Sequence, residues 1–201
     1  MRREGGFTLI ELMIVIAIIA ALAAVAVVAY TRHIKSGRIV ATKTFIAQIQ
    51  ARQAAYFQQF GEYCNASGQT GGSTSFYPAL LNNQEPVAKT WAPTAQGWLD
   101  LGARPEGNHV YAAFFVRASS SATGTPHDFD SSLAASVQIP AQPSAPATPH
   151  PWWYVIAHAD FDGSEATFSG GSCGGALSQT VCTLMWASSA HEEIVIRNEG
   201  K

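Results

Sequence analysis

A run of twenty residues without a charged side chain, from Leu12 to Thr31, constrains this chain more than any other feature. Most of these residues are Ile, Val, Ala or Leu, and a helix of that length reaches about 30 Å, the thickness of a bilayer's hydrocarbon core. Tyr30 and Arg32, at the end of the run, suit the boundary between membrane and water. We therefore predict a single transmembrane helix close to the N-terminus.

The composition excludes several other classes of protein. Charged residues make up 13% of the 201 residues, against about 25% in an ordinary globular chain, which indicates a membrane protein or one rich in interfaces. A net charge of -2 gives no electrostatic footprint for nucleic acid, so we expect no nucleic-acid partner. The three cysteines are too few for a disulfide scaffold and contain no C-x-x-C pair for zinc.

The charges that flank the uncharged run do not settle its orientation. Arg2 and Arg3 precede the run, whereas a larger basic group follows it: Arg32, Lys35, Arg38 and Lys43. Counted by the positive-inside rule, these residues favour a cytoplasmic C-terminal side, but long following domains translocate largely regardless of charge. A secretory signal is an alternative, although its apolar region is usually shorter, at about 7–15 residues.

The ten residues Gly6–Val15, GFTLIELMIV, open the apolar helix and resemble the N-terminus of type IV pilins and type II secretion pseudopilins. The resemblance implies that a prepilin peptidase removes the leader 1–6 by cutting between Gly6 and Phe7, and that the new Phe7 amine is N-methylated. It also implies a single-pass precursor in the inner membrane with a cytoplasmic N-terminus. An inner-membrane platform would then assemble it, together with other pilins, into a homo-oligomeric helical filament outside the cell for adhesion, motility or DNA uptake.

Glu11 is the residue of the apolar helix that most suggests a function. A carboxylate inside an apolar segment is costly and usually has a specific partner. Phe7 and Glu11 are four residues apart and therefore share a helix face. By the resemblance, Glu11 would contact the Phe7 amine of a neighbouring subunit and guide the register of assembly. The alternative is an incidental glutamate near the membrane interface.

Two positions depart from the pattern of many major pilins, which have a glycine and a proline within this helix. The aligned residues here are Ala20 and Val28. Alanine forms helices much better than glycine, and valine lacks the ring that breaks the helical hydrogen bonds, so we expect a more continuous helix. This departure leaves a minor pilin or a pseudopilin, which primes or tips a filament, as the alternative.

The helix is predicted to continue beyond the membrane segment 7–30 as an amphipathic segment, 31–61. No proline occurs before residue 78, and Gly61 is the predicted stop after Phe60. Apolar residues recur there near helical spacing, and we expect them to pack under a head domain: Ile34, Ile39, Val40, Phe45, Ile46, Ile49, Ala54 and Phe57.

The remainder, 62–201, is predicted to be a β-rich head. Four short apolar runs separated by turn residues are candidate strands: 110–116, 152–157, 181–186 and 193–197. An antiparallel sheet packed on the long helix is the simplest arrangement, so we predict an α+β fold, as in pilins. The Ser-, Ala- and Pro-rich stretch 118–151 is interpreted as a surface loop between two strands.

The cysteines allow one C-terminal disulfide. Cys173 and Cys182 flank a predicted loop, and an exported chain resides where disulfides persist. Pilins often have a disulfide loop near the C-terminus, so the resemblance favours the Cys173–Cys182 pair. Cys64 could instead pair with either of them, which leaves its role open.

We predict no catalytic residue, no metal site and no cofactor. The G-x-S-x-G pattern at 170–174 lacks the strand, turn and helix of a hydrolase, so a membrane-anchored binding or hydrolytic domain is only a remote alternative. Asp160 and Asp162 form an acidic turn whose oxygens suit calcium, but it is not an EF-hand. We interpret it as a solvated hairpin turn.

Overall fold

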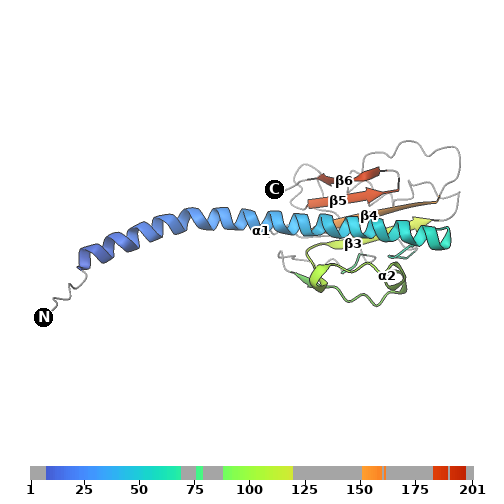
Figure 1. The fold of residues 1–201 in the computed structure, drawn as a ribbon, viewed down its shortest axis with the longest axis horizontal. Coiled ribbons are helices and arrows are strands. Elements are labelled where there is room, and N and C mark those ends of the chain that lie inside the picture. Colours follow the sequence, from blue (N-terminus) through green and yellow to red (C-terminus); the bar gives the residue numbers. More distant parts are fainter. Residues whose placement is uncertain are drawn as a thin grey trace, which may run out of the picture. The chain divides into compact units, whose positions relative to one another are not determined.

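The structure is a computed structural model that describes these residues: 8–68, 76–78, 88–119, 151–159, 161, 183–189 and 191–197. The chain forms two compact units, Met1–Gly37 and Arg38–Lys201. The first unit contains the N-terminal part of one long helix, and the second contains the rest of that helix with the β-rich head (Figure 1).

The long helix α1 extends without interruption from Leu9 to Phe60. It passes Ala20 and Val28 as regular helix, which confirms the continuity expected from the absence of glycine and proline at these positions. It ends where predicted, because Gly61 adopts a left-handed conformation (φ 74°) and donates its N–H to the Phe57 carbonyl at 2.8 Å.

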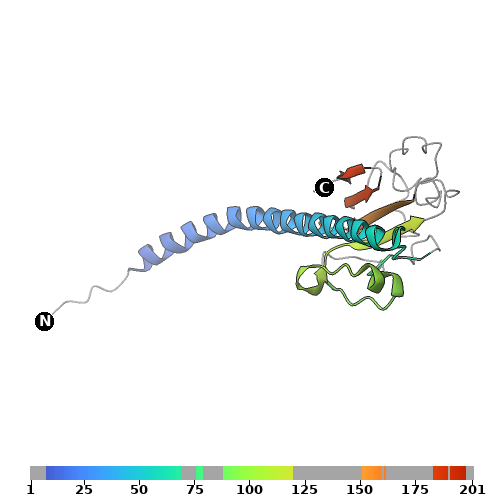
Figure 2. The same cartoon turned by 45° about the vertical axis from the view of Figure 1, so that its right-hand side comes forward.

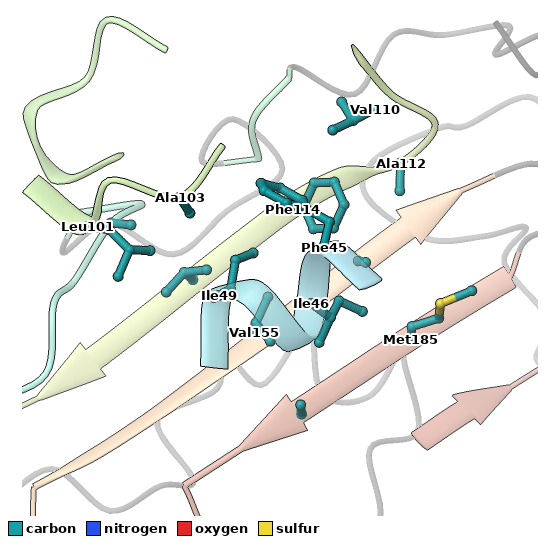
Figure 3. Packing of buried hydrophobic residues seen from close by; sticks show 14 of the residues in the cluster. Phe45, Ile46, Ile49, Leu101, Ala103, Val110, Ala112, Phe114, Val155 and Met185 are labelled. Atoms are coloured by element: carbon teal, nitrogen blue, oxygen red, sulfur yellow. The ribbon is translucent and has the colours of Figure 1, made fainter. Parts of the chain in front are cut away.

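In the second unit, one face of α1 packs against the sheet, as predicted (Figures 1 and 2). Its buried side chains recur every three or four residues: Ile39, Thr42, Phe45, Ile46, Ile49 and Gln53. Figure 3 shows Phe45, Ile46 and Ile49 directed at Phe114 and Val155 of the sheet.

The prediction that all of the recurring apolar residues of the helix pack under the head was wrong in part. Val40 and Ala54 are exposed because each follows a buried position by one residue, which turns its side chain about 100° away from the sheet. Ile34 is also exposed, and Phe57 is half-buried. Gln53, a polar residue, occupies the position where the buried row continues.

A four-stranded antiparallel sheet forms the centre of the head, in the order β3-β4-β5-β6, which confirms the α+β prediction. The strands are β3 (Ala113–Ser119), β4 (Trp152–Ala159), β5 (Thr183–Ser188) and β6 (His191–Arg197). Each coincides with a predicted run, but the predicted strand 110–116 is divided. Its start belongs to β2 (His109–Val110), which pairs with β1 (Lys89–Thr90) in a separate two-stranded sheet.

The two faces of the main sheet carry separate apolar clusters. On the helix side, Phe114, Val116, Val155 and Met185 join the core below α1. The opposite side carries a second buried cluster, mostly aromatic: Phe76, Ala113, Phe115, Trp152, Tyr154, Ile156, Leu184 and Trp186. β3, β4 and β5 read as nearly continuous apolar runs because both of their faces are buried.

Short elements that the sequence did not predict lie between α1 and the sheet strands in the chain. Helix α2 (Gln96–Leu101) ends at Gly102, whose positive φ of 64° lets its N–H bond the Trp98 carbonyl at 3.1 Å. A 3-10 turn, η2 (Glu106–Asn108), leads directly into β2. The buried Trp98 anchors α2 by an edge-on contact with Trp91, at 5.1 Å between ring centroids.

The outer edge of β3 is closed by residues of the preceding loops. Tyr77 and Phe114 exchange two backbone hydrogen bonds of 2.8 Å. Ser67 donates its N–H to the Val116 carbonyl, and its hydroxyl accepts the Val116 N–H, both at 3.0 Å. This edge therefore presents fewer free backbone groups to other chains.

Strands β3 and β4 meet at the two ends of the predicted loop 118–151. Ser119, the last residue of β3, is the register partner of Trp152, the first of β4. Residues 120–150 of that loop lie outside the described residues.

Candidate functional site

Helix α1 begins with three reciprocal hydrogen bonds between Thr8 and Glu11. The Thr8 N–H and hydroxyl both donate to Glu11 Oε2, at 2.9 and 2.7 Å. In return, the Glu11 N–H donates to the Thr8 hydroxyl at 3.3 Å. This is a capping box, in which a Thr at the N-cap and a Glu three residues later satisfy backbone donors that the helix cannot. The T-x-x-E spacing was visible in the sequence, but our sequence interpretation did not use it.

The capping box gives the costly carboxylate a partner within its own chain. Glu11 is exposed, and Thr8 supplies two donors to one of its oxygens. The partner expected from the sequence, the Phe7 amine of a neighbour, is not tested, because Gly6 and Phe7 lie outside the described residues. The second oxygen, Oε1, takes no part in the capping box.

The surface of α1 that follows Glu11 is apolar on every side. From Leu9 to Tyr30, the large apolar side chains that the structure describes are all exposed, from 42% for Val15 to 77% for Leu9. Among the described helices, α1 alone is long and apolar enough to cross a membrane, and none of its most apolar window is buried. Each such side chain would gain roughly 1.5–3 kcal/mol on leaving water, so this surface requires lipid or other helices around it.

The basic residues after this surface begin directly at its end. Arg32 and His33 are exposed and Lys35 is half-buried. Arg38, in the second unit, lies over the ring of Tyr111, with 5.5 Å between the guanidinium carbon and the ring centroid. Arg38 therefore contributes to holding the helix on the head.

Gln53 fixes the chain that follows α1, a role that the sequence did not indicate. Its side chain is fully buried; Nε2 donates to the Cys64 carbonyl at 2.7 Å, and Oε1 accepts the Cys64 N–H at 2.9 Å. A single amide thus satisfies both backbone groups of one residue eleven positions away. No periodic or motif signal distinguishes Gln53 from the glutamines around it.

Of the residues in the cysteine predictions, the structure describes Cys64. Cys64 is a free, buried thiol that donates to the Gly97 carbonyl at 3.3 Å, and burial raises its pKa to about 11. It is therefore protonated and unreactive at neutral pH. Cys173 and Cys182 lie outside the described residues, so their disulfide stays a prediction.

The acidic turn Asp160–Asp162 and the 170–174 pattern also contain residues outside the described part, so neither is tested. Within the part of the chain that the structure describes, no three His, Cys, Asp or Glu side chains gather as a metal site would require.

Among the titratable groups that the structure describes in the head, His158 on β4 has a strongly lowered pKa. Burial, and then the nearby charge of Lys89, lower its pKa to about 4, although part of its surface remains accessible. Burial also lowers the pKa of Lys89. His158 is therefore neutral at pH 7 and contributes to the fold of the head.

Among the comparisons with known proteins, a match to a family model covers the N-terminal segment. No curated protein and no solved structure matches the chain. The N-terminal segment does match a family model, the prokaryotic N-terminal methylation motif, over residues 1–27. This segment includes the capping box and most of the exposed apolar surface. The chain therefore carries the signature of the type IV pilins and pseudopilins, the family that the ten residues Gly6–Val15 resemble.

Proposed function

We propose that this protein is a structural subunit of a type IV pilus filament. A prepilin peptidase removes residues 1–6, the Phe7 amine is methylated, and the precursor resides in the inner membrane with its N-terminus in the cytoplasm. The assembly platform then transfers it, with other pilins, into an extracellular filament. The observation that supports this best is the exposed apolar surface of α1 behind a matched methylation motif.

The physical basis of assembly is an exchange of neighbours around α1. In the membrane, lipid tails cover the apolar surface from Leu9 to Tyr30; in a filament, the same surface packs against helices of other subunits. Contacts between different surfaces of successive subunits do not close into a ring, so they extend into an open filament.

Glu11 has a specific part in this exchange. Thr8 satisfies one oxygen of the carboxylate while the subunit is alone. The methylated amine of a neighbour would supply the positive charge that Thr8 cannot, and hydrogen bonds to charged groups contribute about 1.5–3 kcal/mol. Register between subunits would then depend on this ion pair.

Replacing the carboxylate tests this role. We expect Glu11→Ala or Glu11→Val to be cut normally but to lower the yield of sheared filaments by about tenfold or more. Glu106→Ala, at an exposed glutamate of the head, is the control and should assemble normally. Normal filament yield with both Glu11 variants would remove the role assigned to this residue.

The identity of the subunit is tested by shearing filaments from the native cells and measuring the intact mass of the main band. A dominant chain of 195 residues, 201 less the six of the leader, with a methylated Phe7 is the expected result. An uncut Met1 terminus in the filament fraction would exclude the proposal.

A minor pilin or type II secretion pseudopilin is the second candidate. The uninterrupted α1 favours it, because the glycine and proline of many major pilins are replaced by Ala20 and Val28. Abundance distinguishes the two: a priming subunit stays mainly in the membrane fraction and is found only in traces among sheared filaments.

A further inference from the structure

We infer that the basic turn at the end of the apolar surface, Arg32 to Lys35, binds the phosphate groups of anionic phospholipids on the far side of the membrane. This inference rests on the proposed membrane stage of the subunit and goes beyond its assembly. Arg32, His33 and Lys35 lie within four residues, directly after the uncharged run that ends at Thr31.

The depth of these residues matches the headgroup layer. A run of twenty helical residues spans about 30 Å, and the headgroup region adds roughly 5–7 Å on each side. Arg32 is the first residue beyond the run, and Lys35 lies about 4.5 Å further along the helix axis. Tyr30, 67% exposed, stands at the boundary, where aromatic rings accumulate in membrane proteins.

The geometry of the turn favours a shared anion. Arg32 and Lys35 are three residues apart on a continuous helix, so they occupy neighbouring positions on one face and can contact the same anion. A phosphate suits both, because guanidinium forms paired hydrogen bonds with phosphate oxygens and ammonium acts as a point charge.

The distribution of charge also fits binding to an anionic surface. Lys and Arg normally remain on the cytoplasmic side, yet here the larger basic group lies on the side that the proposed function exports. Removal of the leader takes Arg2 and Arg3 away and makes this imbalance greater. Attraction between these side chains and anionic headgroups would offset the unfavourable placement.

The test uses the full chain in nanodiscs that contain equal amounts of phosphatidylglycerol and phosphatidylcholine. Native mass spectrometry counts the lipids of each kind that stay bound to the released protein. The double variant R32Q/K35Q removes the two charges. The matched control is K43Q/R52Q, which removes two charges from the same helix roughly 16 Å or more beyond Arg32.

We expect the wild type and K43Q/R52Q to retain phosphatidylglycerol preferentially. In R32Q/K35Q this preference should be at least about fivefold weaker. Salt at 0.5 M should weaken the preference of the wild type to the same extent. Equal preference in all three chains, or an equal loss in the control, would overturn the inference. A chain that does not enter the nanodiscs at all would instead contradict the membrane stage of the proposed function, so the two failures are distinguishable.

Discussion

Gln53 connects the end of α1 to the rest of the head through one buried amide. Both of its polar atoms bond the backbone of Cys64, where the chain has turned away from the helix. Since no water reaches the side chain, its removal would leave two buried backbone groups without partners.

Gln53→Leu, of similar volume, should therefore lower the free energy of unfolding of the head by about 2–4 kcal/mol. Urea unfolding of the full chain in detergent, followed by Trp fluorescence, would measure it. Gln58→Leu, at an exposed position of the same helix, is the control and should change the midpoint little. Equal midpoints for the two variants would show that the amide is not needed.

His158 makes the stability of the head depend on pH. Its pKa is about 4 in the folded state and near 6.5 when unfolded, so the unfolded chain binds the proton first as pH falls. The stabilisation is complete above pH 6.5 and is lost as pH falls toward 4. We expect a loss of about 2 kcal/mol, since the partly accessible ring keeps some solvation.

The measurement is the urea midpoint at pH 7 and pH 4.5 for the wild type and for His158→Gln. Carboxylates titrate in both chains, so only the difference between them reports His158. A wild type that loses no more stability than the variant on acidification would contradict the assignment.

Glu11 and Gln53 differ in how clearly the sequence indicates their roles. Glu11 was identified from the sequence because a charge within an apolar run is conspicuous. Its partner Thr8 was available from the T-x-x-E spacing, but one hydroxyl among many is a weak signal without the helix start. Gln53 could not have been found, because its role depends on where the loop at Cys64 returns.

At the scale of elements, two helical glycines have opposite surroundings. A Cβ at Gly97, in α2, would lie 2.7 Å from the backbone oxygens of Asn65 and Ala66. Backbone atoms cannot move aside as a flexible side chain does, so α2 must shift. A Cβ at Gly37, in α1, would meet nothing within 4 Å.

Gly97→Ala is therefore expected to destabilise the head by about 1–3 kcal/mol, against the usual helix preference for alanine. A Cβ at Gly37 has open space around it, so Gly37→Ala should stabilise the surrounding turn of α1. We expect amide hydrogen exchange in that turn to slow by about fivefold. Urea unfolding and hydrogen exchange on the full chain measure the two effects. Identical unfolding midpoints for Gly97→Ala and the wild type would refute the close approach.

The elements that could be predicted are those with long apolar patterns. α1 and the four sheet strands fall close to their predicted places, because a membrane-length run and buried strands leave little choice of structure. β1, β2 and α2 are two to six residues long, and tertiary contacts such as the Trp91–Trp98 pair decide them. No local pattern indicates such short elements.

At the scale of the whole molecule, the two units obey different constraints. The first must match the thickness and polarity of a bilayer, and its matched motif covers residues 1–27. The head only has to bury one face of α1 and hold a sheet against it, a requirement that many sequences meet. The family signal therefore lies in the N-terminal helix.

The register of β3 and β4 has a practical consequence for changing the number of residues between these strands. Because Ser119 and Trp152 face each other, the chain leaves the sheet and returns to it at the same point. Closing a flexible connection costs only about 0.6 kcal/mol more for each doubling of its length, so residues added between these two ends should leave the strand pairing in place. We therefore expect a reporter peptide inserted between Ser119 and Trp152 to leave the pairing of β3 with β4 and the apolar surface of α1 unchanged.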